Sequence, residues 1–249
     1  MAPPEEKDPF ATAYRKIFAP SKALLQKEFT HAGFTYGEIF ELAAGLKKSL
    51  ARRGPEKLVC LCTENKAVIT ASILACLSGA FRIILPHSFS TQALVELYEA
   101  ASFDAIISDR PEETHGMEVI IPTAGNPDDL KPDNLRHPDD PFLKLFTGGS
   151  TGKPRLWSKS PRNLLGEAFY LRDKFGLSSK DLFISTVPPY HIYGLLFSIL
   201  APLVSHARVL PEIYTFPQEI ITTINRNRAT VLVSVPVHYR CLKVDNLDA

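Results

Sequence analysis

Cysteine and net charge are both scarce in this sequence. Its 28 lysines and arginines against 27 aspartates and glutamates leave a net charge of +1 over 249 residues, so no overall field would draw the chain to nucleic acid or to an anionic membrane. The four cysteines form neither a C-x-x-C pair nor a Cys/His cluster with zinc spacing, which argues against a zinc site. We therefore expect a cytoplasmic protein of a reducing compartment, with no metal held by its own side chains and no nucleic-acid partner.

Long apolar runs and a signal sequence are also absent. The most apolar stretch, residues 67–85, is interrupted by polar residues and favours a buried helix followed by a strand over a membrane span. The N-terminus lacks the basic-then-apolar order of a signal peptide. With 45% apolar residues, the chain can bury the core of one large domain or two small ones. We expect a soluble protein with no stable membrane insertion.

What the sequence does contain, from Leu58 onward, is an alternation of short apolar runs and helical patterns. This alternation predicts an α/β fold of layered βαβ units, with mainly parallel sheets and helices packed on them. A capping box at Thr35 and Glu38 predicts a further helix before the first strand. Strands are expected at 58–63, 81–85, 105–108, 142–147, 181–187, 208–210 and 230–235, and helices at 67–77, 91–101, 161–175 and 217–227.

The stretch 125–141 is dense in proline and aspartate and has no periodicity, so it is expected to be a linker. The expected division of the chain is an N-terminal arm at 1–29, a first α/β subdomain at 30–124, this linker, and a second α/β subdomain at 142–249.

The segment 146–155, Phe-Thr-Gly-Gly-Ser-Thr-Gly-Lys-Pro-Arg, combines three glycines, three hydroxyl residues and a lysine between two apolar runs. Glycines let backbone N–H groups converge, hydroxyls add donors and lysine adds charge, which is the chemistry of a phosphate cradle. A glycine- and serine-rich hairpin turn explains the same composition equally well.

Two short motifs compete for this segment. A Walker loop would need glycine at Thr147 and a hydroxyl residue at Pro154, and it has neither. The pattern G-x-S-x-G fits 148–152 and nominates Ser150, Asp181 and His191 as the triad of a serine hydrolase. Such a serine turns directly from strand into helix, whereas Pro154 and strand-like residues follow here, so the hydrolase is kept as an alternative.

The segment resembles the phosphate loop T-S-G-[ST]-T-G-x-P-K-G of the adenylate-forming superfamily, which includes acyl-CoA synthetases, peptide-synthetase adenylation domains and luciferases. Thr147, Gly149, Ser150, Thr151, Gly152 and Pro154 are in register, while Gly148, Arg155 and Leu156 depart. Further segments resemble motifs of the family in the same order, so the likeness extends over residues 30–242. These segments are 34–38, 74–80, 188–195 and 231–242.

The resemblance implies an AMP-forming ligase. ATP and a carboxylic acid would form an acyl-adenylate and pyrophosphate, with Mg²⁺ accompanying ATP, and the acyl group would pass to coenzyme A or another thiol. His191 would lie beside the reacting carboxylate, and Tyr190, Tyr193 and Gly194 would wall a pocket compatible with fatty or aromatic acids. The ATP phosphates are assigned to Thr147, Gly148, Gly149, Ser150, Thr151 and Gly152, and charge and placement add Lys153.

Enzymes of this family are longer, with a small mobile C-terminal domain. The sequence has no Y-G-x-T-E segment for adenine, no T-G-D segment for ribose and no C-terminal adenylation lysine. It therefore resembles about the first half of such an enzyme, with an incomplete second subdomain, and a missing C-terminal half is its expected partner. The chain would be a truncated piece, a fragment or a naturally short relative, inactive alone. A non-catalytic binding or scaffold module of the same fold is a further alternative.

Overall fold

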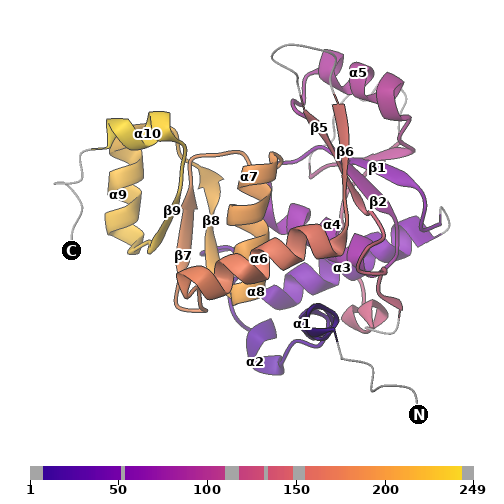
Figure 1. Cartoon of the computed structure of the whole chain (residues 1–249), viewed down its shortest axis with the longest axis horizontal. Helices are drawn as coiled ribbons and strands as arrows, with labels where there is room; N and C mark the ends of the chain where they lie inside the picture. The colour runs from indigo at the N-terminus through magenta and orange to yellow at the C-terminus, as the bar shows by residue number, and fades with distance from the viewer. Residues whose placement is uncertain (1–7, 52–53, 110–117, 132–133, 148–154, 243–249) are drawn as a thin grey trace.

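The protein consists of two sheets with helices between and around them (Figure 1). This computed structural model describes residues 8–51, 54–109, 118–131, 134–147 and 155–242. The six-stranded sheet has the order β4-β3-β1-β2-β5-β6 and is parallel except for β6, which pairs antiparallel with β5. Its strands are β1 (Leu58–Leu61), β2 (Arg82–Leu85), β3 (Ala105–Ile107), β4 (Val119–Ile120), β5 (Leu143–Thr147) and β6 (Arg155–Lys159).

The second sheet has three parallel strands in the order β8-β7-β9. These are β7 (Leu182–Ser185), β8 (Arg208–Ile213) and β9 (Val231–Val233). The α-helices are α1 (Pro9–Ile17), α2 (Lys22–Leu25), α3 (Tyr36–Leu50), α4 (Lys66–Leu77), α5 (Thr91–Ala101), α6 (Pro161–Phe175), α7 (Ile192–Leu195), α8 (Ala201–Ser205), α9 (Pro217–Asn227) and α10 (Pro236–Cys241). A 3₁₀ turn η2 (Pro127–Leu130) and a π-helical segment η4 (Leu196–Leu200) complete the described elements.

The predicted α/β class with mainly parallel strands is confirmed, as are the helices 161–175 and 217–227 to the residue. The capping box at Thr35 is present, because its hydroxyl accepts from the Glu38 N–H while the Glu38 carboxylate accepts from the Thr35 N–H. The structure adds α1 and the helical run 192–205, which the sequence analysis did not predict. The run begins with isoleucine, tyrosine and glycine, residues that carry little helical signal.

The sheets divide the chain differently from the expected boundary at 125–141. Strands β5 and β6 follow that stretch but complete the first sheet, since β5 pairs in parallel with β2. The stretch itself begins docked on α3, because Gly125 N–H donates to Glu41 O and a Cβ on Gly125 would collide with the backbone of Gly45. Close backbone approach to α3 therefore holds residues that composition alone marks as a linker.

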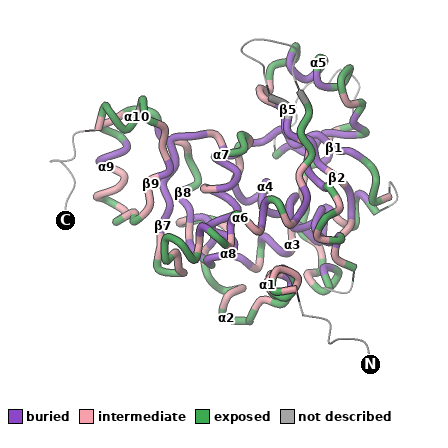
Figure 2. The backbone as a smooth tube through the Cα atoms, in the orientation of Figure 1, coloured by how far each residue is buried: buried purple, intermediate pink, exposed green. Residues whose placement is uncertain are grey.

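Helix α4 forms the centre of the molecule, and all 12 of its residues are buried (Figure 2). It covers one face of the first sheet, together with α3, while α5 covers the opposite face. The connection β1–α4–β2 advances across the sheet and β2–α5–β3 returns, and right-handed crossovers put helices of opposite direction on opposite faces. In β1, Val59 and Leu61 therefore join the central core, whereas Leu58 and Cys60 face α5.

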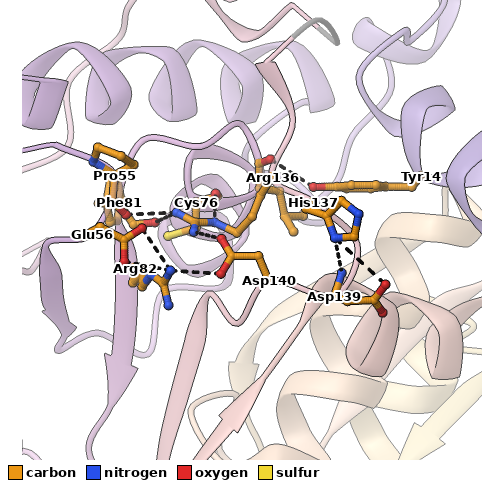
Figure 3. A network of polar contacts seen from close by, with 11 residues as sticks. Tyr14, Pro55, Glu56, Cys76, Phe81, Arg82, Arg136, His137, Asp139 and Asp140 are labelled. Carbon is orange, nitrogen blue, oxygen red and sulfur yellow. Dashed lines mark hydrogen bonds and ion pairs between the residues drawn. The ribbon is translucent and has the colours of Figure 1, made fainter.

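Arg136 holds the carboxyl end of α4 (Figure 3). The residue is 6% exposed, and its guanidinium donates to Cys76 O at 3.2 Å, Phe81 O at 3.0 Å and Pro55 O at 3.1 Å. Asp140 accepts from the same guanidinium and neutralises its charge. One planar group thereby joins three separate segments, which a single ammonium could not do.

Lys66 joins the other end of α4 to the second sheet. Its side chain is buried, and its Nζ donates to Leu210 O at 2.6 Å and to Glu212 O at 3.1 Å, both in β8. Burial lowers the pKa of Lys66 from its ordinary 10.5 to about 8, and the attraction of Glu212 only partly opposes this shift.

Replacing Arg136 by lysine should destabilise the fold, because Cys76 O, Phe81 O and Pro55 O cannot all keep a donor. We expect the urea-derived free energy of unfolding to fall by about 3 kcal/mol. The matched control Arg226→Lys, at an exposed position, should stay within about 0.5 kcal/mol of the wild type. Equal effects at the two positions would contradict the role of Arg136.

The Lys66 ammonium should make stability rise with pH. Because its folded pKa is depressed, the unfolded state binds more protons between pH 8 and 10.5, so this contribution is fully present above the unfolded pKa and is lost as pH falls through 8. The unfolding free energy of the wild type minus that of Lys66→Met should grow by about 2 kcal/mol from pH 7.5 to 9.5. Lys48→Met, at an exposed lysine, should show a constant difference. A pH-independent difference for Lys66→Met would refute the assignment.

Candidate active site

The segments that follow the parallel strands of the first sheet meet at one edge, because parallel strands end on the same side. Residues 62–66 follow β1, 86–89 follow β2, and Ser108 and Asp109 follow β3. Thr147, the first predicted phosphate-loop residue, ends β5 at this same edge. Open α/β sheets bind ligands at such an edge.

The other predicted phosphate-loop residues, Gly148, Gly149, Ser150, Thr151, Gly152 and Lys153, lie outside the described residues. Their flanks are described: β5 ends at Thr147 and β6 begins at Arg155, antiparallel to it. The described flanks are therefore a strand before the segment and a strand after it. A nucleophile elbow, by contrast, leads directly from a strand into a helix.

The hydrolase triad is not assembled. Asp181 lies just before β7 and His191 lies after it, so a four-residue strand of about 13 Å separates them. The Asp181 carboxylate accepts hydrogen bonds from Ser178 and from Thr230. This aspartate organises the start of β7, so the structure gives no support to the hydrolase hypothesis, which used it to orient His191.

Tyr190 and His191 bring the second sheet to the edge of the first. The Tyr190 ring lies 4.5 Å from the Phe89 ring and 4.7 Å from the His191 ring, centroid to centroid. Burial raises the pKa of Tyr190, and the neighbouring Glu64 carboxylate raises it further. Segments that follow β1, β2 and β7 therefore converge on one aromatic ring.

His191 is exposed and is the N-terminal flanking residue of α7, with no capping hydrogen bond from its side chain. Burial of part of the ring lowers the pKa of His191, and the nearby His87 lowers it further. Both effects favour the neutral imidazole at pH 7, which can accept one hydrogen bond and donate another.

Tyr193 and Gly194 have other surroundings. The Tyr193 hydroxyl donates to Ser234 O at 3.1 Å, beyond β9, and its ring lies 4.9 Å from Phe197. Gly194 is buried, and a Cβ there would collide with Pro188 O. The need for this close approach explains the glycine without any ligand.

A cavity of about 500 Å³ opens between the two sheets, and the sequence analysis assigned none of its lining residues to a functional site. The turn into α4 lines part of it, and there Asn65 Oδ1 accepts from the Ala67 and Val68 N–H groups while Thr63 donates to Asp109 at 2.6 Å. The position of residues 62–66 and Asp109, directly after parallel strands, was the signal that could have identified them. The lining residues are Thr30, Gly33, Phe34, Cys62, Thr63, Glu64, Asn65, Lys66, Phe89, Asp109, Pro211, Glu212 and Ile213.

Tyr190 and His191 are not among the residues that line this cavity, but Tyr190 contacts its rim through Phe89 and Glu64. Among the described residues, no group of three or more His, Cys, Asp or Glu side chains is arranged to hold a metal ion. Across the same part of the chain, every helix is too short or too polar to cross a bilayer.

Known proteins resemble this chain in sequence. Residues 19–248 match the model of the family described as AMP-binding enzyme. The sulfoacetate–CoA ligase of Cupriavidus necator is 27% identical over 57% of this chain and 29% of its own length. The 4-coumarate–CoA ligase-like 8 protein of Arabidopsis thaliana is 30% identical over 55% of this chain and 26% of its own length.

Solved structures share the fold. ATP-bound MatB from Rhodopseudomonas palustris superposes with a TM-score of 0.76 at 22% identity, covering 93% of this chain and 50% of MatB. The MenE o-succinylbenzoate–CoA synthetase of Bacillus subtilis, in complex with AMP, gives a TM-score of 0.68 at 18% identity over 88% of this chain and 60% of its own. The chain thus spans half of MatB and under a third of the two ligases above. Since the family model matches nearly all of its residues, the chain belongs to the AMP-binding enzyme family.

Proposed function

We propose that this sequence is part of an ATP-dependent, AMP-forming ligase, which activates a carboxylic acid as an acyl-adenylate and transfers the acyl group to coenzyme A or another thiol. The observation that carries the proposal is the position of Thr147: the segment 148–154 starts at the carboxyl edge of β5, on the sheet edge next to the cavity. The family match over 19–248 and the CoA ligases among the relatives support the same reaction.

In this proposal the phosphate loop binds the ATP phosphates. Backbone N–H groups around Gly148, Gly149 and Gly152, the hydroxyls of Thr147, Ser150 and Thr151, and the Lys153 ammonium would supply the donors. The departing pyrophosphate gathers negative charge, so donors that face it stabilise the transition state. Mg²⁺ would accompany the ATP phosphates.

His191 is proposed to lie beside the reacting carboxylate, where a neutral imidazole can hold the acid by a hydrogen bond without adding charge. Its partial exposure and its contact with Tyr190 are compatible with this role. Tyr190, Tyr193 and Gly194 are proposed to wall the acyl pocket, with Gly194 acting through its close packing on Pro188. Coenzyme A is the proposed thiol, since the relatives named above are CoA ligases.

The phosphate loop should give this chain a measurable affinity for nucleotide. We expect calorimetry with ATP and Mg²⁺ to detect binding, and Lys153→Ala to weaken it about tenfold because one charge-assisted contact is lost. Lys180→Ala removes an exposed lysine beyond α6 and should leave the affinity unchanged. Absence of any heat with ATP or pyrophosphate would favour a non-catalytic scaffold of the same fold.

We further propose that these 249 residues alone do not complete adenylation, because the sequence offers no counterpart of the family's adenine, ribose and lysine motifs. The purified chain should show no carboxylate-dependent exchange of pyrophosphate into ATP at any acid concentration, while ATP binding persists. Exchange above the rate of a heat-denatured sample would overturn this proposal.

A further inference from the structure

Among the described residues, Lys66 is the only buried lysine, with 1% of its surface exposed. An ammonium group at such a position is usually paired with a carboxylate. Here the hydrogen-bond partners are two main-chain carbonyls, Leu210 O at 2.6 Å and Glu212 O at 3.1 Å. A main-chain carbonyl cannot rotate away as a side chain can. The two hydrogen bonds therefore fix Lys66 to the backbone of β8.

The two carbonyls are available because β8 is irregular at this point. Phe183 pairs with Val209 and Ser185 with Ile213, so one residue of β7 lies opposite three of β8. Pro211, in the middle of the irregular stretch, has no N–H to give to a ladder. The irregularity interrupts the pairing with β7 at the two residues whose carbonyls Lys66 binds.

This contact joins two groups of residues that line the cavity. Residues 62–66 and Phe89 follow strands of the first sheet, whereas Pro211, Glu212 and Ile213 belong to β8. Lys66 belongs to the first group by its backbone and reaches the second with its side chain. Burying a charge disfavours folding, as the depressed pKa of this lysine also indicates, so stability does not account for the residue.

We propose that Lys66 is a positioning residue, whose ammonium group ties the amino end of α4 to β8 and thereby fixes the width of the cavity between the two sheets. The inference rests on the proposed function only in taking this cavity as part of the ligand site. The tie itself is a property of the free protein and is tested without ATP or acid.

Pulsed electron paramagnetic resonance can measure the separation of the two sheets. Spin labels at Glu99→Cys on α5 and Glu219→Cys on α9, both exposed positions, report it in a Cys241→Ser background, because the remaining cysteines are buried. The parent should give one narrow distance distribution. Lys66→Met should broaden or displace it, with circular dichroism unchanged, and the control Lys48→Met should reproduce the parent.

An unchanged distribution in folded Lys66→Met would overturn the proposal. If that variant does not fold, the contact is tested in the wild type instead. ¹⁵N-detected NMR measures how fast its lysine ammonium protons exchange with water. We expect the Lys66 protons to exchange with water at least tenfold more slowly than those of exposed Lys48, since two hydrogen bonds and burial protect them. Equal rates would mean that Lys66 is not held by β8, and the proposal would fail. The spin-label distances and the exchange rates are both measured without ATP. A failure to bind ATP in the calorimetric test would therefore count against the proposed function and not against the role of Lys66.

Discussion

The structure depends on one constraint, the complete burial of α4. All 12 residues of this helix are buried, so the unpaired backbone groups at its two ends need partners from the protein. At the amino end, Asn65 accepts from two N–H groups. At the carboxyl end, the Tyr14 hydroxyl and the Arg136 N–H both donate to Leu77 O, and the Arg136 side chain donates to Cys76 O. The hydrogen bonds that satisfy these groups also hold distant parts of the chain against the helix ends.

The same constraint shapes the candidate site. The turn that caps α4 also carries Glu64 and Lys66, which face the second sheet. One short segment therefore ends a strand, starts the central helix, contacts Tyr190 and reaches β8. Because the carboxyl ends of β1, β2, β3 and β5 share an edge, the segment also lies on the side of the sheet where the predicted phosphate loop begins. The residues that cap the central helix therefore also form part of the candidate site.

Charge is distributed unevenly in this arrangement. Glu64, Asp109 and Glu212 line the cavity beside a single buried ammonium, whereas the predicted phosphate loop brings a lysine. Asp109 is held by Thr63 and Asn65, and Glu212 accepts from the Tyr214 hydroxyl, so two of these carboxylates have structural partners. Their hydrogen bonds hold these acidic side chains in place beside the cavity.

The sequence by itself determined the class of fold, most strands and helices, and the family. Periodicity, caps such as Thr35–Glu38 and Ser160–Asn163, and the motif 147–154 act over a few residues, and local rules suffice to interpret them. Tertiary structure decided the rest. It placed β5 and β6 in the first sheet, put Asp181 and His191 at opposite ends of β7, and joined Lys66 to carbonyls 144 and 146 residues further along the chain. Strand order and buried partners depend on how segments distant in sequence pack, and no local pattern records that packing.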